Sequence, residues 1–236
     1  HDLDKHEKEG VFRKLISGYQ SDVDRHFEIR MEEFASIPRT PICYSTPSEV
    51  RRLYDHEVLL DAEQAGTNHK SAFNAVQGIS TADKSRFMRK HWEVQGNDRF
   101  KSITKGGSNA WIVPHITNTV EWNNDGVEVR RSSPEIRTRN EKLYGKKGLT
   151  WTYIKDTGRR FGYHPGGLFS VNGLMLFPKG ETSLWTTMAV LNSDLYHSLF
   201  LSQTIERNWN PGEVGAVPWI EELEKQNELS ESSKEQ

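Results

Sequence analysis

The chain of 236 residues contains one cysteine, and it lacks any apolar run of the length that crosses a membrane. A single cysteine excludes an internal disulfide and fits a reducing cytoplasm, which is the expected location. Cys43 lies between apolar neighbours, so we expect an inert, buried thiol. No segment approaches the ~18 apolar residues of a membrane-spanning helix. The sequence indicates a soluble globular protein without membrane contact, and because it starts at His1 we expect a piece of a longer protein.

Common signatures of catalysis and metal binding are also missing. The nine histidines are scattered, and none forms the two-histidine helical pair or Cys/His cluster that binds zinc. The glycine-rich stretches 105–107 and 165–167 lack the spacing of a phosphate-binding or dinucleotide-binding loop. Residues 221–225 resemble part of a nuclease motif, but they lie in an acidic tail. We therefore predict no catalytic residue, no metal site and no cofactor in this chain, and interpret it as a binding module.

Charge is unevenly distributed, although the net charge is only −2. Between Lys84 and Arg160 the chain has 17 lysines and arginines against eight aspartates and glutamates, an excess of nine positive charges. A basic middle segment between acidic ends is typical of a surface that binds a polyanion such as a nucleic acid. The alternative is that these side chains only solvate surface loops, and charge alone does not decide between the two.

Apolar spacing predicts helices at both ends of the chain. In residues 1–33 apolar residues recur about every four positions among charged neighbours, which favours one amphipathic helix. A second helix is expected from about Ser48, a favourable N-cap, to about Gln64. A third is expected over residues 184–201, followed by a short return strand, and the tail after Ile220 should be disordered.

The centre of the chain consists of short β-prone runs rich in Trp, Val, Ile, Thr and Tyr, at 110–116, 120–130 and 149–155. A turn is expected at Asn124-Asp125-Gly126, because Asp-Gly readily supplies positive φ. A tight hairpin is expected around Asn172-Gly173, with strands at 168–171 and 174–177. The sequence predicts a mixed α/β (α+β) fold with a central twisted mixed sheet. We expect three parts: a helical connector or docking segment (1–70), a binding domain (71–220) and an acidic tail (221–236).

Six short segments, in order and spacing, resemble motifs of one protein family. Residues 32–44 carry Phe-x-x-Ile-Pro and Pro-Ile-x-Tyr, residues 78–94 carry Arg-Phe-x-Arg, and residues 120–129 carry Val-x-Trp-x-Asn-Asp-Gly-x-Glu. The other three segments are 139–144, 148–152 (Gly-Leu-Thr-Trp) and 188–193 (ending Leu-Asn-Ser). Together they resemble the C-terminal target-recognition region of PglX-type adenine-specific DNA methyltransferases of BREX phage-defence systems. That region is related to type IIL restriction-modification enzymes and type I specificity subunits. The resemblance spans about residues 25–220, with departures at Arg39, Ala82 and Lys84.

The resemblance implies sequence-specific recognition of double-stranded DNA, as the specificity portion of an N6-adenine methyltransferase in BREX or restriction-modification phage defence. The chain itself lacks the Asn/Asp-Pro-Pro-Tyr tetrapeptide that holds a flipped adenine, and the glycine-rich turn that cradles S-adenosylmethionine. Enzyme activity and S-adenosylmethionine are therefore expected only of the parent protein. The expected partners are double-stranded DNA, a methyltransferase catalytic domain in the same or a separate chain, and other BREX proteins.

Two basic segments are predicted to contact DNA. The segment from Thr81 to Arg89 suits phosphate contacts, unless Arg86 pairs internally with a carboxylate such as Glu93. The polar loop 130–140 is the candidate for base readout, because Arg pairs with guanine and Asn with adenine in the major groove. The alternative for this segment is a solvated loop. The predicted DNA-binding residues are Lys84, Arg86, Arg89, Lys105, Arg130, Arg131, Arg137, Arg139, Asn140, Lys146, Lys147, Lys155, Arg159 and Arg160.

Most of the tryptophans and one polar pair are assigned to the interior rather than to DNA. Because the resemblance places the tryptophans mostly in strand-like runs, we favour core packing over base stacking. Asn192 and Ser193 are expected to cap or bridge within the fold. The tryptophans concerned are Trp92, Trp111, Trp122, Trp151 and Trp185.

Two other functions stay open. A protein-interaction module would dock other defence components through the acidic segment 1–33, or act as a DNA-mimicking phage inhibitor, without reading sequence itself. An RNA-binding or nuclease fragment has no supporting motif.

Overall fold

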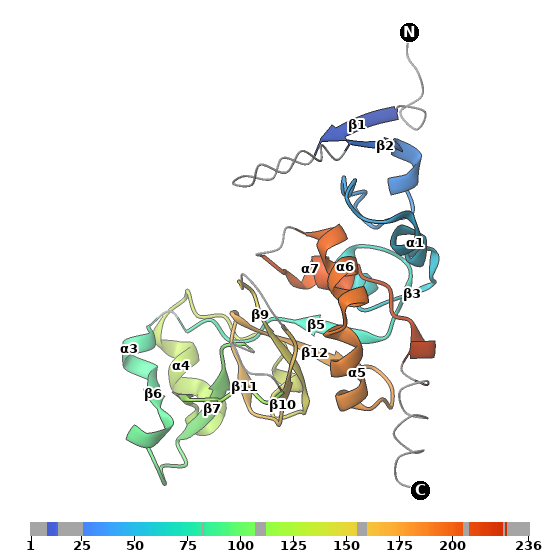
Figure 1. Cartoon of the computed structure of the whole chain (residues 1–236). Helices are drawn as coiled ribbons and strands as arrows, with labels where there is room; N and C mark the ends of the chain where they lie inside the picture. Colours follow the sequence, from blue (N-terminus) through green and yellow to red (C-terminus); the bar gives the residue numbers. More distant parts are fainter. Residues whose placement is uncertain are drawn as a thin grey trace, which may run out of the picture.

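Two four-stranded sheets form the framework of the chain, and each has its own hydrophobic core (Figure 1). The predicted mixed α/β class is confirmed. Among the described residues no helix combines the length and apolar character needed to span a bilayer. The computed structural model describes residues 9–13, 26–81, 83–106, 112–154, 160–204, 208–223 and 225.

The first sheet is antiparallel throughout, with the strand order β10-β9-β12-β5. Its central strand β12 is buried on both faces, and its side chains alternate between two cores as the strand period of two requires. Leu174 and Leu176 join the larger core, whereas Met175 and Phe177 join a small cluster on the other face. The strands are β5 (Phe73–Val76), β9 (Gly148–Thr152), β10 (Gly162–His164) and β12 (Gly173–Pro178).

Helices from both ends of the chain cover the first sheet. Phe34 and Tyr54 from the N-terminal part share one core cluster with Trp151 of β9 and Leu199 of α6. The division at residue 70 remains a prediction, but this shared core ties both sides of it together. The helices are η1 (Met31–Phe34), α1 (Ser48–Arg51), η2 (Arg52–Asp55), α2 (Ala62–Ala65), α5 (Leu184–Leu191), α6 (Asp194–Gln203) and α7 (Pro211–Gly215). Two short strands, β3 (Val58–Leu59) and β4 (Lys70–Ser71), lie between them in the sequence.

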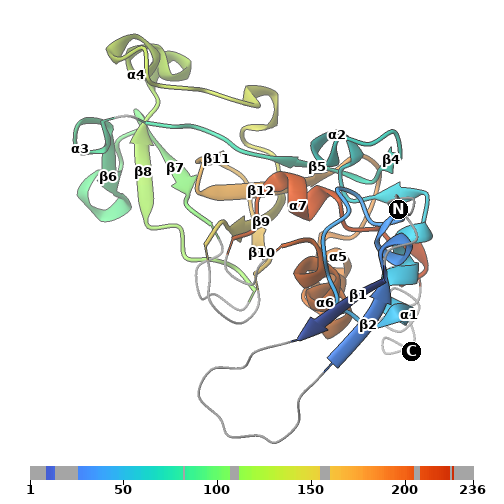
Figure 2. The same cartoon turned by 90° about the horizontal axis from the view of Figure 1, so that it is seen from above.

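The second sheet has the order β11-β7-β8-β6, and only the β11–β7 pair is parallel. It lies at the end of the molecule away from α1, with α3 and α4 beside it (Figure 2). Its core is built from side chains such as Phe87, Val120 and Val129. We call this end, residues 78–147 with β11, the second half. The elements are α3 (Lys84–Phe87), β6 (Met88–Lys90), η3 (His91–Glu93), β7 (Phe100–Thr104), β8 (Asn118–Glu121), η4 (Asn123–Gly126), α4 (Val127–Ser132), η5 (Glu141–Leu143) and β11 (Leu168–Phe169).

A small apolar cluster joins the two sheets. It consists of Val76, Phe169, Met175 and Phe177, with Tyr144 packed against it. The Tyr144 ring meets the Phe169 ring edge to face at 5.1 Å. Since Tyr144 also packs against the core of the second sheet, it connects the two cores.

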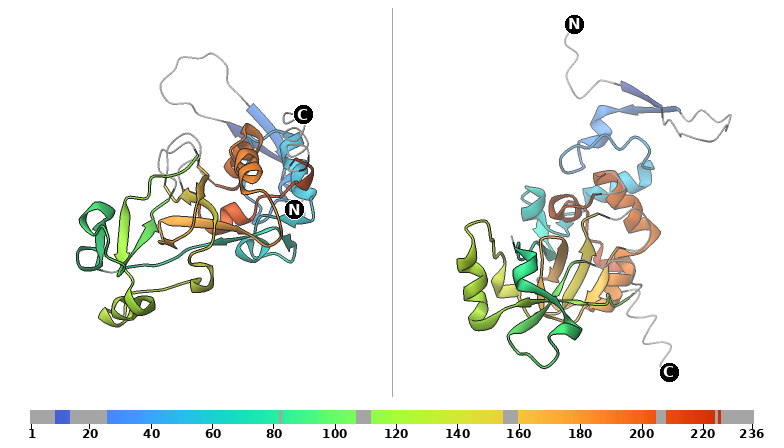
Figure 3. Two further views of the ribbon diagram at one scale, coloured as in Figure 1. Left: turned by 90° about the horizontal axis from the view of Figure 1, so that it is seen from below. Right: turned by 90° about the vertical axis from the view of Figure 1, so that its left-hand side faces the viewer.

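The amphipathic helix predicted over residues 1–33 is wrong in its described part. Residues 9–13 and 26–30 form strands β1 (Glu9–Arg13) and β2 (His26–Arg30), which pair antiparallel. The two-stranded sheet of β1 and β2 projects from the rest of the molecule beside α1 (Figures 1 and 3). The error has a physical cause, because apolar residues four positions apart lie on one face of a strand as well as of a helix. The protein-docking alternative relied on an acidic helix over residues 1–33, so it loses that structural support.

The other two predicted helices start where expected but are interrupted. The helix expected from Ser48 ends at Asp55 and is followed by β3 and the separate helix α2. The helix expected over 184–201 breaks at Asn192 and Ser193. Ser193 is extended, and its side chain accepts a hydrogen bond from the Tyr196 amide, so it begins a new helix. After α6, the expected return strand is reduced to the isolated bridges of Asn208 with Ile154 and of Pro218 with Leu59.

Among the predicted strands, those at 149–155 and 174–177 are reproduced closely, as β9 and β12. The expected strand at 110–116 is absent from its described residues 112–116. The expected strand at 120–130 ends at Glu121, and helix α4 follows the turn. The turn itself is confirmed, since Asn124, Asp125 and Gly126 have φ values of 46°, 55° and 76°.

The tight hairpin predicted around Asn172-Gly173 is wrong. Its two strands belong to different sheets, because β11 pairs with β7 while β12 pairs with β9 and β5. Gly173 instead allows its backbone to lie close to the backbone at Thr104, since a Cβ there would be 2.5 Å from the Thr104 carbonyl oxygen. Of the predicted disordered tail, all but residues 221–223 and 225 lie outside the described residues.

Candidate nucleic-acid interface

Backbone pairing brings the two predicted DNA-contacting segments together. Ser80 and Arg137 form an antiparallel bridge with N–O distances of 2.9 and 3.3 Å. The neighbouring Ile79 amide donates to the Phe169 carbonyl of β11 at 2.8 Å, so this pairing continues the edge of the second sheet. Arg137 is thereby fixed only a few residues from Lys84, the first residue of α3.

Gln77 holds the candidate base-reading residues Arg139 and Asn140. Its side-chain Oε1 accepts a hydrogen bond from Arg139 Nη1 at 3.0 Å, and its backbone carbonyl accepts one from Asn140 Nδ2 at 2.8 Å. Asn140 has φ +57°, a left-handed conformation that asparagine tolerates better than most residues. Both side chains remain exposed, and Arg139 keeps four of its five N–H donors for other partners.

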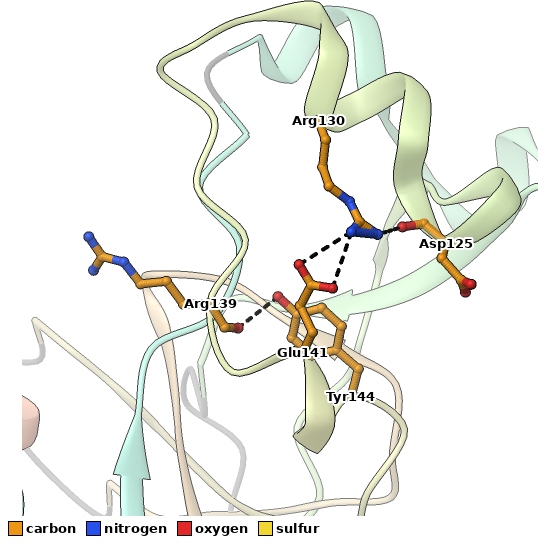
Figure 4. A network of polar contacts seen from close by, with 5 residues as sticks. All are labelled: Asp125, Arg130, Arg139, Glu141 and Tyr144. Atoms are coloured by element: carbon orange, nitrogen blue, oxygen red, sulfur yellow. Dashed lines mark hydrogen bonds and ion pairs between the residues drawn. The ribbon is translucent and has the colours of Figure 1, made fainter.

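Arg130, in contrast, is engaged inside the protein (Figure 4). Its Nη1 donates to both Glu141 carboxylate oxygens, at 3.4 and 3.2 Å, and its Nη2 donates to the Asp125 carbonyl. The guanidinium also lies 5.5 Å from the centre of the Trp122 ring. We therefore assign Arg130 to holding α4 against η5 rather than to base readout.

The left-handed turn before α4 is locked against Trp122. A Cβ on Gly126 would lie 2.6 Å from the Trp122 ring, so only glycine fits there. Tyr144 meets the other side of this cluster at 5.8 Å from Trp122, and its hydroxyl donates to the Arg139 carbonyl at 2.9 Å. Burial, followed by the nearby Glu141 carboxylate, raises the pKa of Tyr144, which keeps this hydroxyl protonated as a donor. The cluster of Trp122 and Tyr144 thus supports both α4 and the loop of residues 130–140, which we call the reading loop; Figure 4 shows the contact of the Tyr144 hydroxyl with the Arg139 carbonyl of this loop.

Arg86 of α3 and Arg89 of β6 have local partners but stay exposed. Arg89 Nη1 donates to the Ser85 carbonyl at 2.7 Å and to two further carbonyls at the end of α3, which suits a cation at a helix C-terminus. Arg86 lies 4.8 Å from the Phe87 ring centre. The alternative ion pair between Arg86 and Glu93 does not form. The Glu93 carboxylate instead accepts a hydrogen bond from the Lys90 amide.

Three lysines of the second half lie close to one another. Partial burial, followed by the positive charges of Lys84 and Lys90, lowers the pKa of Lys105. Lys105 directly follows β7, and Lys90 ends β6 opposite Asn118 of β8, so both lie at the same end of the sheet. Such a cluster of like charges favours a bound anion, which would relieve the repulsion.

The remaining predicted residues divide into exposed, buried and undescribed. Lys146 and Lys147 are exposed between η5 and β9, and Arg131 is exposed on α4. Arg160 is 3% exposed, with its guanidinium 4.0 Å from the Trp209 ring centre, so we correct its assignment from DNA contact to the core. Lys155 and Arg159 lie outside the described residues.

The predicted burial of the tryptophans is confirmed for some and wrong for others. Trp122 and Trp151 are buried, whereas Trp92 is 58% and Trp185 47% exposed. Trp111 lies outside the described residues. The prediction for the polar pair is confirmed: Asn192 bridges to the backbone of residues 160 and 161, and Ser193 caps α6.

Cys43 is buried, as predicted, and the burial raises the pKa of its thiol, which disfavours the reactive thiolate. Among the described residues no three His, Cys, Asp or Glu side chains gather into a metal site. In the first half, meaning the first sheet with the elements that cover it, a cavity of about 450 Å³ is lined by side chains that include Phe73, Lys179, Glu181 and Trp219. It lies on the first sheet, away from the basic segments.

Sequence reasoning missed Gln77 and Glu141, the partners of Arg139 and Arg130. Neither carries a charge pattern that suggests DNA binding. A weak signal was present for Gln77, a polar residue directly after the buried strand Phe73–Val76 and before the family-like segment at Gly78. A polar side chain at the end of a buried strand commonly forms a hydrogen bond with a residue distant in the sequence.

No protein-family profile matches the chain, but one curated protein is similar to most of it. It is 28% identical over 218 residues to the adenine-specific methyltransferase BrxX of Escherichia coli O9:H4 (strain HS). The match covers 86% of this chain but 16% of that relative, so the chain spans about a sixth of its length. The expected relationship to an adenine-specific methyltransferase is confirmed as distant homology.

Proposed function

We propose that this chain reads the sequence of double-stranded DNA, as the specificity portion of an adenine-specific DNA methyltransferase in a phage-defence system. The observation that carries the proposal is the Gln77 clamp, which holds the exposed Arg139 and Asn140 beside a cationic segment. Homology to an adenine-specific methyltransferase supports the choice of DNA as the polyanion.

The arrangement separates the two tasks that DNA recognition requires. Exposed lysines and arginines of α3, β7 and the 146–147 segment suit phosphate contacts, which supply affinity without sequence information. Arg139 and Asn140 offer bidentate donors and acceptors for guanine and adenine edges. Because Gln77 restricts them before DNA arrives, less conformational entropy is lost on binding.

The chemistry of methyl transfer is assigned to other parts of the protein. This chain contains no Asn/Asp-Pro-Pro-Tyr tetrapeptide, so S-adenosylmethionine and the target adenine would be held by the catalytic domain. That domain is the partner we propose, in the same or a separate chain.

The first test is duplex binding by the chain, measured by fluorescence anisotropy over a salt series, followed by selection of a preferred site from random duplexes. We expect affinity that falls steeply with salt and tightens on one short sequence. Absence of duplex binding at low salt, both alone and together with the catalytic domain, would overturn the proposal.

The second test compares two charge reversals of equal size in the methyltransferase. Arg137→Glu with Arg139→Glu should abolish site-specific methylation while assembly with other defence proteins continues. Lys70→Glu with Lys179→Glu, exposed lysines of the first half, should leave methylation unchanged. Lost assembly with intact methylation in the first variant would instead support the protein-interaction function.

A further inference from the structure

An exposed tryptophan of the second half, Trp92, stands among other aromatic and cationic side chains. Trp92 belongs to η3 and is 58% exposed. His91 meets it edge to face at 5.0 Å, and His91 lies 6.1 Å from His115. Lys90 Nζ lies 5.8 Å from the centre of the Trp92 ring. We call these four residues the Trp92 patch; His91 and His115 are also exposed.

Several hydrogen bonds hold the patch in place. The Glu93 carboxylate accepts from the Lys90 amide at 2.6 Å, and the His91 amide donates to the Thr117 carbonyl at 3.0 Å. Lys90 Nζ donates to Asn118 Oδ1 at 3.2 Å, across the β6–β8 pair. An exposed indole on an anchored backbone loses little freedom on binding, so its stacking energy is available to a ligand.

The surroundings of the patch are positively charged. Lys90 ends β6 opposite Asn118 of β8 and Lys105 directly follows β7, so both lysines lie at the same end of the second sheet. Burial, followed by the positive charges of Lys84 and Lys90, lowers the pKa of Lys105, in agreement with this placement. The acidic residue within η3, Glu93, already faces the Lys90 amide. The patch therefore suits a ligand that combines a flat ring with negative charge. The exposed Trp185 differs, because Tyr163 stacks on it at 4.3 Å in the first half.

We propose that the Trp92 patch is a stacking site for an unpaired base of a DNA strand, with Lys84, Lys90 and Lys105 contacting the adjoining phosphates. A flat aromatic surface flanked by cations is how proteins bind unstacked bases without sequence preference. The proposal deepens the proposed function, since a base leaves the duplex before its amino group is methylated. The target base itself would go to the catalytic domain, so the patch would receive the base that has lost its pairing partner.

The experiment uses the chain and two 20-base-pair duplexes that differ only by one extra, unpaired 2-aminopurine. The chain should bind the bulged duplex more tightly than the fully paired one and quench the 2-aminopurine fluorescence. Trp92→Ala should lower affinity for the bulged duplex about tenfold, within the range measured for base stacking on aromatic residues. Affinity for the paired duplex should change less than twofold.

Two matched variants separate stacking from damage to the fold. Trp92→Phe keeps an aromatic face and should retain most of the preference and of the quenching. Trp185→Ala removes the exposed tryptophan of the first half and should leave both unchanged. Thermal unfolding of all three variants verifies that they remain folded.

The outcomes distinguish this proposal from the proposed function. If the paired duplex binds but the bulge gives neither preference nor quenching, the stacking site is refuted while DNA recognition stands. Equal loss in Trp185→Ala, or full preference in Trp92→Ala, also refutes it. If a 12-nucleotide single strand binds through Trp92 but no duplex binds, the stacking site stands and duplex recognition falls. If none of the three DNAs binds, both fall, and the patch is then better assigned to a protein partner.

Discussion

Gln77 and Arg139 are separated by 62 positions in the chain, and their side chains meet at 3.0 Å. Gln77 directly follows β5 of the first sheet, whereas Arg139 belongs to the reading loop. The contact therefore fixes a candidate base-reading side chain to the framework. It allows a prediction about specificity that does not require removing any charge.

Gln77→Ala should lower affinity for the preferred site about threefold to tenfold, as expected for the loss of one hydrogen bond. The fall for unrelated duplexes should be smaller, because phosphate contacts are untouched. The backbone carbonyl that holds Asn140 remains in this variant. Binding curves on both kinds of duplex measure the effect, and Gln95→Ala, at an exposed glutamine outside the reading loop, serves as the control. An equal loss on both duplexes would show that Gln77 does not act through Arg139.

Arg130 and Arg131 are adjacent in the sequence, but in the structure we expect only Arg131 to contact DNA. Arg130 is bound to Glu141, whereas Arg131 is exposed and, among the described residues, makes no side-chain hydrogen bond or ion pair. Arg131→Gln should reduce the slope of log affinity against log salt by about one, with unchanged stability. Arg130→Gln should mainly lower the free energy of unfolding, because it leaves Glu141 without its partner. The reverse pattern would mean that Arg130 is the phosphate contact.

Gly126→Ala should destabilise the chain by about 3 kcal/mol, because the residue has φ +76° and its Cβ would overlap the Trp122 ring. Gly96→Ala provides the matched comparison. Gly96 has φ +78° but open space around its Cβ, so only the left-handed strain of about 1 kcal/mol applies. Urea unfolding of both variants gives the difference. Equal losses would show that the Trp122 contact relaxes at no cost.

His164 makes stability depend on pH. It is 1% exposed, and burial lowers its pKa to about 4. Below the ordinary histidine pKa of about 6.5 the unfolded state takes up a proton that the folded state refuses. This contribution to stability is therefore complete above pH 6.5 and is lost as pH falls from about 6.5 to 4, by up to about 3 kcal/mol.

The measurement is the free energy of urea unfolding of the wild type and of His164→Asn at pH 7.5, 6 and 5. The difference between the two proteins should shift by up to about 2 kcal/mol over this range, because asparagine does not titrate. A constant difference across the three values would mean that His164 has the same pKa in the folded and unfolded states.

The sequence predicted the fold class and two of its local features well. Strand β9 and the left-handed turn at Asn124-Asp125-Gly126 were both predicted, because β-branched, aromatic and Asp-Gly signals act over a few residues. The hairpin expected at Asn172-Gly173 failed for the opposite reason. Whether adjacent short strands pair with each other or with β7 and β9 depends on contacts distant in sequence.

The candidate site was predicted only as a region. Exposed cations such as Arg131 and Arg139 followed from charge, and the structure keeps them exposed. Charge alone could not separate Arg130 and Arg160 from these exposed cations. Arg130 is bound to Glu141, and Arg160 lies on Trp209 in the core. The exposure of Trp92 was equally hidden, because the resemblance placed the tryptophans mostly in strand-like runs, whereas Trp92 lies in η3 between His91 and Glu93.

Between Val76 and Gly148 the chain makes one excursion from the first sheet and then returns to it. Three of the four strands of the second sheet, together with α3 and α4, are built within that excursion. Both ends of it border β12, two strand spacings apart. The proposed recognition surface is therefore carried by one continuous segment of the chain. A foreign segment in its place would have to restore the pairing with β11, the packing of Tyr144 on Phe169, and the backbone contacts of Ile112 with Tyr163 and of Gly145 with Gly167.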